Sequence, residues 1–261
     1  MEIMLVNGLR TNVGLLPAKE STGEAVVFVH GMGTDSLASF YLTLASPVSA
    51  AGIDVISYDL RGHGKTEIPD SGYTLKDFVA DLDDLLRQVR PDAPVHLVGN
   101  SFGGTIAYSY ALTNPERVRS IVCIEAEPPT EVWADKMTQI LDYTAEFLSA
   151  EENYDWIESA YSAHHRRLAR MAAKRIMATS ITQEVPLGPL MTLDDVRSIS
   201  CPVLSLLGQN GYQSDDLDAL TSLLPRGERV VFEGQGHSVL VEQHRRVREL
   251  VLDWVARHAG D

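Results

Sequence analysis

Positive charge is scarce in this sequence. Its 22 Lys and Arg residues stand against 36 Asp and Glu, which gives a formal net charge of -14 at pH 7. Nucleic acids and anionic membrane surfaces attract basic patches, so we expect neither as a partner. Long apolar runs are missing too, and residues 1–6 have neither the basic start nor the apolar stretch of a signal peptide. We therefore expect a cytoplasmic protein that does not enter a membrane.

Cysteine is rare as well, with two residues in the chain. Cys123 and Cys201 each lie in an apolar, strand-like run, which favours buried free thiols over a disulfide in a reducing compartment. The adjacent residues His164 and His165 are poorly placed to bind a metal together, because neighbours on a helix point in different directions. The sequence therefore indicates neither a metal site nor a cofactor.

What the chain does have is an alternation of strand-like and helix-like segments. Its 261 residues, with 44% hydrophobic content, suffice for one large domain with a full core. Strands are expected over residues 2–6, 9–16, 25–30, 53–59, 95–98, 118–125, 203–207 and 229–232, the first two joined by an Asn7-Gly8 hairpin turn. Helical spacing marks residues 37–51, 75–89, 104–113 and 241–258. The pattern predicts an α/β fold, with a mostly parallel eight-stranded sheet and helices on both faces.

One stretch, residues 128–190, breaks this alternation. It reads as mainly helical, and breakers stand at both ends: Pro128 and Pro129 open it, and Pro189 follows Gly188 near its end. Such breakers are expected where an insertion leaves and rejoins a core. We therefore expect a core domain formed by residues 1–127 and 191–261, and an inserted helical cap formed by residues 128–190.

The most informative segment is Gly99-Asn100-Ser101-Phe102-Gly103. It follows an apolar strand and precedes a helix-like stretch, so the serine sits where a strand turns sharply into a helix. In a Gly-x-Ser-x-Gly turn the serine backbone is strained, and the glycines keep neighbouring segments from clashing. This context makes Ser101 a candidate nucleophile. The alternative is a Gly- and Ser-rich loop that merely caps the next helix.

A serine nucleophile needs a base within hydrogen-bond reach and an acid that orients the base. Histidine suits the first role because its unperturbed pKa lies at about 6.5. Of the eight histidines, His237 is the best candidate, because it follows the last expected strand among small residues that leave its ring free to reach across a loop. Taken alone, it also fits an ordinary loop histidine.

As a set, the motifs of this chain resemble the α/β-hydrolase family. They are the serine turn, His30-Gly31-Met32-Gly33 after an earlier strand, Arg61-Gly62-His63-Gly64 after the next one, and the late Gly236-His237 pair. They span nearly the whole chain apart from the cap, and they imply the α/β-hydrolase fold. Matched position by position, the resemblance implies Ser101 as nucleophile, His237 as base, and the backbone amides of Met32 and Phe102 as the oxyanion hole.

The acid departs from the family's common pattern. Many relatives carry an aspartate shortly after the next-to-last strand, whereas this sequence has Gly211 there. Either Asp215 or Asp216 serves from a longer loop, or the acid has moved to Glu125 at the end of the preceding strand. The second arrangement resembles that of zearalenone lactonases, and ligand sites of open α/β sheets gather at such strand ends. We favour Glu125, with Asp215 and Asp216 next and Glu127 last.

A serine in the turn implies acyl transfer through a covalent acyl-enzyme, whereas dehalogenase and epoxide hydrolase relatives carry an aspartate there. The expected substrate is an ester, lactone or thioester. A carbon-carbon hydrolase acting on a β-diketone-like compound stays open, as does a non-catalytic receptor of this fold. Gly31, Val239 and Leu240 are expected to line the substrate pocket, and Trp133 fits pocket lining and cap core equally well. These residues suggest a pocket for a bulky, mostly apolar small molecule.

Overall fold

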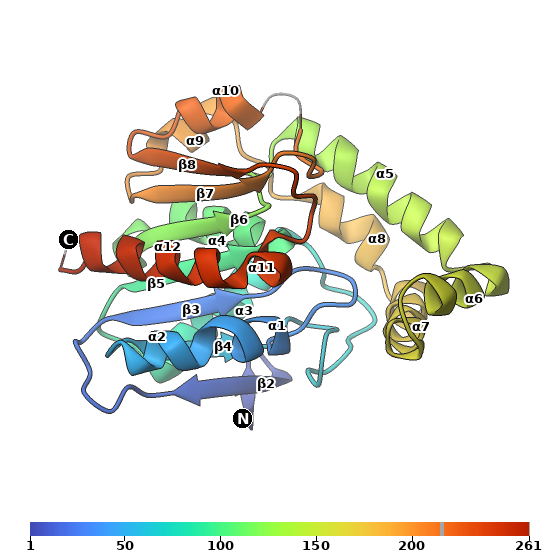
Figure 1. The fold of residues 1–261 in the computed structure, drawn as a ribbon, viewed down its shortest axis with the longest axis horizontal. Helices are drawn as coiled ribbons and strands as arrows, with labels where there is room; N and C mark the ends of the chain where they lie inside the picture. Colours follow the sequence, from blue (N-terminus) through green and yellow to red (C-terminus); the bar gives the residue numbers. More distant parts are fainter. Residues whose placement is uncertain (215–216, 261) are drawn as a thin grey trace.

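A central sheet with helices on both faces makes up the body of the protein (Figure 1). The computed structural model describes residues 1–214 and 217–260. Within those residues, eight strands form one sheet in the order β1-β2-β4-β3-β5-β6-β7-β8. The strands are β1 (Glu2–Val6), β2 (Leu9–Leu16), β3 (Ala25–Val29), β4 (Asp54–Tyr58), β5 (Val95–Asn100), β6 (Val118–Ile124), β7 (Val203–Gly208) and β8 (Gly227–Phe232). Each overlaps a range expected from hydrophobic patterning.

The pairing directions follow the connections between the strands. β1 and β2 pair antiparallel across Asn7 and Gly8, whose φ angles are 47° and 80°. This is the left-handed geometry that an Asn-Gly hairpin turn needs. β2 also runs antiparallel to β4, and the other neighbouring strands are parallel. The expected mostly parallel sheet is confirmed.

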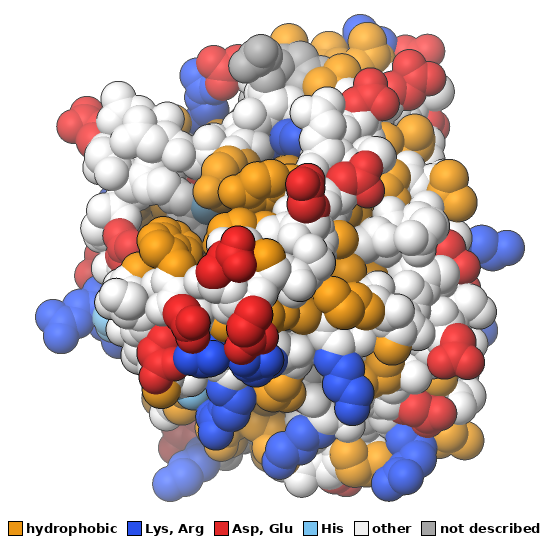
Figure 2. Space-filling view, turned by 90° about the vertical axis from the view of Figure 1, so that its right-hand side faces the viewer, with side chains coloured by type: hydrophobic (Ala, Val, Ile, Leu, Met, Phe, Trp, Pro, Cys, Tyr) orange, Lys and Arg blue, Asp and Glu red, His pale blue; other side chains and the backbone are white. Residues whose placement is uncertain are grey.

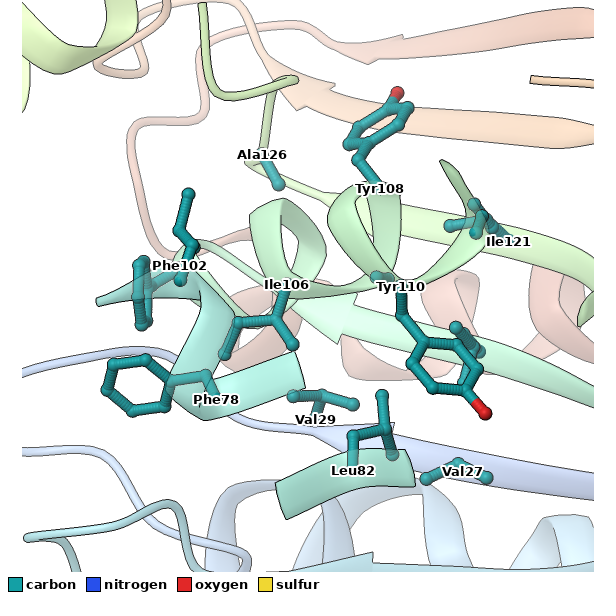
Figure 3. Close-up of a cluster of buried hydrophobic side chains, with 14 of the residues drawn as sticks. Val27, Val29, Phe78, Leu82, Phe102, Ile106, Tyr108, Tyr110, Ile121 and Ala126 are labelled. Carbon is teal, nitrogen blue, oxygen red and sulfur yellow. The ribbon is translucent and has the colours of Figure 1, made fainter. Parts of the chain in front are cut away.

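Two layers of helices bury the two faces of the sheet. α3 (Leu75–Val89) and α4 (Phe102–Thr113) cover one face, and α2 (Ser46–Ala50), α11 (Val239–Glu242) and α12 (His244–Arg257) cover the other (Figure 1). β3 is buried along its whole length, as its apolar sequence predicts. Around α4, the side chains of Phe78, Phe102, Ile106 and Val29 belong to one buried apolar cluster (Figure 3). The core on this face therefore anchors the segment that follows Ser101.

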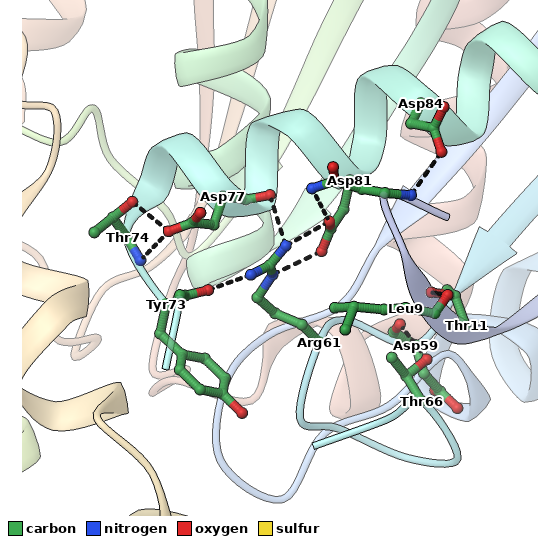
Figure 4. Close-up of polar contacts among 12 residues, drawn as sticks. Leu9, Thr11, Asp59, Arg61, Thr66, Tyr73, Thr74, Asp77, Asp81 and Asp84 are labelled. Carbon is green, nitrogen blue, oxygen red and sulfur yellow. Dashed lines mark hydrogen bonds and ion pairs between the residues drawn. The ribbon is translucent and has the colours of Figure 1, made fainter. Parts of the chain in front are cut away.

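A buried ion pair fastens the loop after β4 to α3. Arg61 donates from Nε and Nη2 to the two carboxylate oxygens of Asp81, over 2.7 and 2.6 Å, and also to the carbonyl oxygens of Gly72 and Asp77 (Figure 4). The Asp77 carboxylate accepts a hydrogen bond from the Thr74 N–H over 3.0 Å, which forms part of a capping box at the start of α3. Bidentate guanidinium-carboxylate contacts fix geometry strongly. Arg61, which belongs to one of the four motifs, therefore has a structural role.

Residues 131–187 form a helical layer beyond the carboxyl ends of the parallel strands (Figure 1). It contains α5 (Glu131–Phe147), α6 (Glu151–Ala160), α7 (Ala163–Ala178), α8 (Ile181–Glu184) and a 3-10 turn at Val185–Leu187. α6 and α7 share a small apolar cluster that includes Tyr154, Ala169 and Ala173. We call this layer the helical insertion. Its helical content agrees with its sequence pattern, and its role as a cap stays a prediction.

Several short helical segments differ from the expected ranges. The stretch expected over 37–51 is helical from Ala38 to Ala50, but it contains a π-helical turn (Tyr41–Ala45) between α1 (Ala38–Phe40) and α2. Pro47, near the start of α2, cannot donate the N–H that a regular α-helix needs there. α4 begins at Phe102 rather than at Gly104. A 3-10 turn (Pro115–Arg117), α9 (Leu193–Ser198) and α10 (Leu217–Ser222) were not expected. Segments of three to six residues are too short to show helical periodicity.

Both cysteines are buried and free, as expected. Burial raises the pKa of Cys201 to about 12 and also raises that of Cys123. The two thiols therefore stay protonated and unreactive at neutral pH. Across residues 1–214 and 217–260, no helix combines the length and the apolar character needed to cross a membrane.

Acid is expected to destabilise the fold through three buried histidines. Burial lowers the pKa of His30 and of His63, and it lowers that of His96 to about 4. As pH falls below about 6.5, the unfolded chain takes up protons at these rings while the native state does not, so the free energy of unfolding decreases. We expect the urea midpoint to fall between about pH 7.5 and about pH 5. His96→Gln should flatten the dependence of the urea midpoint on pH, whereas His164→Gln, at an exposed position, should not. A urea midpoint that stays constant over this pH range in the unmodified protein would contradict the expectation.

Candidate active site

Ser101 lies at a strained corner between β5 and α4. Its φ is 50° and its ψ is -122°, a conformation that costs a non-glycine residue about 1–3 kcal/mol. A Cβ on Gly103 would lie 2.0 Å from the Val29 carbonyl oxygen, and one on Gly99 would lie 2.4 Å from the Gly104 nitrogen. Neighbouring backbone therefore requires both glycines of the motif. The serine side chain lines a cavity at this corner.

His237 and Glu125 extend a line of hydrogen bonds that starts at Ser101. His237 Nε2 lies 3.0 Å from Ser101 Oγ, and His237 Nδ1 lies 3.1 Å from Glu125 Oε2. The three side chains come from the end of β5, the end of β6 and the loop after β8. With the proton on Nδ1, the imidazole donates to the carboxylate and keeps Nε2 free to accept the serine proton. The structure thus brings these three sequence-predicted residues together.

The Glu125 carboxylate is held in place by several donors. Its side chain is 1% exposed. Glu125 Oε1 accepts hydrogen bonds from the Gly208 N–H and from Gln213 Nε2, the latter over 3.3 Å. The backbone N–H of Glu125, at a φ of 53°, donates to the Leu206 carbonyl over 2.8 Å. A buried carboxylate needs such donors, and here they also fix its position beside His237.

The position of Gly211 accounts for the missing aspartate. A Cβ built on Gly211 would lie 2.6 Å from Glu125 Oε2 and 2.4 Å from Gln213 Nε2. The Glu125 carboxylate therefore occupies the space that an acid side chain at position 211 would need. The other two candidates for the acid, Asp215 and Asp216, lie outside the described residues.

Glu127 makes contacts away from the imidazole. It forms an ion pair with Lys136 of α5 and accepts a hydrogen bond from the Ser214 N–H over 3.2 Å. Lys136 also donates to the Tyr212 carbonyl over 2.9 Å. These contacts tie the loop after β7 to the helical insertion.

The backbone amides of Met32 and Phe102 lie on the two segments that flank Ser101. Phe102 is the first residue of α4, and first-turn amides have no partner inside their helix. A Cβ on Gly31 would lie 3.3 Å from Ser101 Cβ, so the loop that carries Met32 runs beside the serine. The Gly31 N–H donates to Asp35 Oδ2 over 2.7 Å, which orders this loop. The two segments are therefore near enough to serve an oxyanion formed at Ser101.

A cavity of about 270 Å³ opens over Ser101 between the sheet and the helical insertion. Its apolar lining includes Met32, Phe102, Trp133, Ile140, Leu141 and Ile176. Trp133 is buried, and its ring lies 6.4 Å from that of Phe102 at an interplanar angle of 13°, so it belongs to both the pocket and the core. On the face that carries the insertion, hydrophobic side chains gather beside charged ones (Figure 2). Such a lining suits an apolar ligand.

Three residues expected in the pocket are absent from the cavity lining. Val239 and Leu240 are buried in the core cluster shared with α12, and neither belongs to the cavity lining. The expectation was wrong because both residues open the short helix α11, which packs on the sheet rather than over Ser101. Gly31 is buried next to Ser101 and is likewise absent from the lining.

The cavity also has polar lining that sequence reasoning missed. Arg175 of α7, Lys136 of α5, and Tyr212 and Gln213 after β7 all line it. The Tyr212 ring lies 5.3 Å from that of His237. None of these residues belongs to a motif, and spacing along α7 does not separate buried from exposed cations. The one available signal was the closeness of Tyr212 and Gln213 to Gly211, where the family's aspartate is expected.

Comparisons with known proteins agree with the fold described above. A sequence profile described as "Alpha/beta hydrolase family" matches residues 26–250, which include every motif discussed above. A 2-hydroxy-6-oxo-2,4-heptadienoate hydrolase from Pseudomonas putida is 29% identical over 271 residues, covering 97% of this chain and 95% of that one. A proline iminopeptidase from Lactobacillus delbrueckii subsp. bulgaricus is 24% identical over 276 residues, covering 90% and 91%. Among solved structures, an esterase from Exiguobacterium antarcticum has a TM-score of 0.77 at 19% identity, covering 98% and 100%.

Proposed function

Because the chain belongs to the alpha/beta hydrolase family, we propose that it is a serine hydrolase that cleaves a carboxylic ester or lactone of a bulky, mostly apolar small molecule. The observation that carries the proposal is the hydrogen-bonded line from Ser101 through His237 to Glu125. In this proposal residues 128–190 act as a cap over a core formed by residues 1–127 and 191–261. No cofactor takes part in the chemistry.

Acylation starts when Ser101 Oγ attacks the carbonyl carbon of the substrate. His237 Nε2 lies 3.0 Å from Oγ and removes its proton. Glu125 keeps the Nδ1 proton in place and stabilises the imidazolium that forms. The oxyanion accepts hydrogen bonds from the amides of Met32 and Phe102, and one such donor lowers the barrier by about 3–4 kcal/mol.

Collapse of this intermediate breaks the bond to the alcohol oxygen, and His237 returns its proton to that leaving group. The acyl group stays on Ser101 as an ester. A water molecule then gives a proton to His237 and attacks the acyl carbon through a second oxyanion. The carboxylic acid leaves, the proton goes back to Ser101, and the enzyme is regenerated.

The pocket supports an apolar acyl or aromatic group as the main recognition element. Trp133, Ile140 and Ile176 line it from the helical insertion, and Met32 and Phe102 line it from the core. Burying apolar ligand surface stabilises the complex by about 25 cal/mol per Å² before the entropy cost of binding. The net charge of -14 disfavours the approach of anionic substrates.

A carbon-carbon hydrolase is the second candidate. The likeness to a 2-hydroxy-6-oxo-2,4-heptadienoate hydrolase over 97% of this chain favours it. The two candidates separate in a direct comparison of kcat/KM on p-nitrophenyl esters, aromatic lactones and vinylogous β-diketones. Faster cleavage of the diketone than of every ester and lactone would move the assignment to carbon-carbon bonds.

A fluorophosphonate probe should label Ser101. The probe reacts with an activated serine and mimics the tetrahedral intermediate, so the oxyanion hole and His237 should accelerate its attachment. We expect one probe per chain by intact mass, and no label on Ser101→Ala. Ser222→Ala, an exposed serine in α10, serves as the matched control and should label normally. Absence of both labelling and ester turnover in the unmodified protein would favour a non-catalytic receptor.

A further inference from the structure

Arg175, in the last turn of α7, is a buried cation held by neutral partners. Its guanidinium donates to the Gly62 carbonyl oxygen over 2.9 Å and to the Gly33 carbonyl oxygen. In the part of the chain that the structure describes, no carboxylate forms an ion pair with it. Burial lowers the pKa of Arg175 to about 10, so the side chain still carries its charge at neutral pH.

The two carbonyl groups belong to different loops of the core. Gly33 lies in the loop after β3 and Gly62 in the loop after β4, and both have a positive φ (80° and 72°). Arg175 comes from the helical insertion and therefore joins the insertion to both loops at once. The contact with Gly33 spans 142 positions in the sequence.

Hydrogen bonds hold the loop after β3 on both sides of Met32. On one side, the Gly31 N–H donates to Asp35 Oδ2 over 2.7 Å. On the other side, the Gly33 carbonyl accepts from Arg175. Met32, whose amide is the proposed oxyanion donor, lies between these two fixed points. The direction in which the Met32 N–H points therefore depends on both contacts.

Packing gives this loop little other support near Gly33. Gly33 lines the catalytic cavity and also a second cavity of about 400 Å³, and Arg175 lines both. A Cβ built on Gly33 would meet no atom within 4 Å. Because there is open space around Gly33, the hydrogen bond from Arg175 holds this residue in place, as close packing holds residues elsewhere in the core.

We propose that Arg175 is a positioning residue that fixes the oxyanion loop, so that the oxyanion hole takes its working geometry only while α7 is seated on the core. This inference rests on the proposed function, because it assigns Met32 as an oxyanion donor. Arg175 acts through the loop and does not touch the reacting atoms. The helical insertion then contributes to the rate of the chemical step as well as to the choice of substrate.

The test is Arg175→Met, with Arg175→Lys as the conservative variant and Lys174→Met as the matched control. Lys174 is an exposed cation one residue away on the same helix. On a neutral p-nitrophenyl ester, Arg175→Met should lower kcat roughly 10- to 100-fold with KM within about twofold, since misplacing a donor by about 1 Å has an effect of this size. Arg175→Lys should recover part of the loss because it can reach one carbonyl, and Lys174→Met should behave as the unmodified protein.

A trifluoromethyl ketone separates positioning from general loosening of the fold. It forms a tetrahedral oxyanion on Ser101, so its affinity should fall by the same factor as kcat/KM in Arg175→Met, while KM for the neutral ester stays within about twofold. Circular dichroism and a melting curve show whether Arg175→Met is folded. If it is not folded, kcat and the affinity for the ketone are measured on Arg175→Lys instead.

Two results would overturn the inference. One is an unchanged kcat and inhibitor affinity in both Arg175 variants. The other is a loss confined to esters that carry a carboxylate, because Arg175 would then bind the substrate directly. Failure of the proposed function itself is distinguishable, since the unmodified protein would then show no ester turnover and no ketone adduct on Ser101.

Discussion

Glu125→Gln should lower kcat by about 10³- to 10⁴-fold, because an amide in place of the carboxylate favours the wrong imidazole tautomer. Glu125 Oε2 lies 3.1 Å from His237 Nδ1 in the native site. A glutamine at this position can present an N–H to Nδ1, which moves the ring proton to Nε2 and blocks removal of the serine proton. The substitution is nearly isosteric, so KM and the circular dichroism spectrum should change little. The measurement is steady-state kinetics on a p-nitrophenyl ester.

Glu127→Gln distinguishes the two buried glutamates. Glu127 pairs with Lys136 rather than with His237, so this variant should lose less than about tenfold in kcat. Unchanged kcat in Glu125→Gln, together with a large loss in Asp215→Asn or Asp216→Asn, would move the acid to the loop after β7. A large loss in Glu127→Gln alone would move it to Glu127.

Moving the acid from position 125 to position 211 should restore activity. The exchange variant Glu125→Gly with Gly211→Asp should exceed the single variant Glu125→Gly by at least about 10²-fold in kcat, as a re-formed acid-imidazole contact supports much of the tautomer control. The Cβ of an acid at position 211 would start 2.6 Å from the place of Glu125 Oε2. The backbone permits both changes: Glu125 has a φ of 53°, which suits glycine, whereas no left-handed φ restricts Gly211.

Two further variants control the exchange. Gly211→Ala in the presence of Glu125 should lower kcat, because the new methyl group overlaps the carboxylate oxygen. Gly211→Asp in the presence of Glu125 should lower it further, since two carboxylates in one site repel each other. A folded exchange variant no more active than Glu125→Gly would show that the space at Gly211 is not equivalent to the acid site.

The sheet could be predicted from the sequence because its strands carry their own signals. Residues 25–29 are apolar throughout, as a strand covered on both faces must be. Asn7 and Gly8 supply the positive φ angles of the first turn. The short helices α9 and α10 have six residues each and give no periodic pattern. The irregular hydrogen bonding inside the helix over residues 38–50 could have been anticipated from Pro47.

Local sequence likewise identifies some of the site residues and not others. Ser101 stands in a motif whose glycines are needed by the backbone, and His237 follows the last strand among small residues, so local sequence identifies both as candidates. Glu125 became a candidate through the glycine at position 211, its place at a strand end and the family resemblance, and its contact with His237 spans 112 positions. Arg175 carried no signal, because neighbouring Lys174 is exposed in the same basic stretch. Which cation points inward depends on how α7 docks, and docking is a property of the tertiary structure.

Rapid-quench mass spectrometry with p-nitrophenyl butyrate tests the central claim most directly. The proposed mechanism requires an ester between the butyryl group and Ser101 on the path to product. We predict a burst of p-nitrophenol, matched by a butyryl group on the peptide that contains Ser101 and absent from Ser101→Ala. Steady release of p-nitrophenol with no acyl group on Ser101 at any time point, or a butyryl group on a different residue, would contradict it.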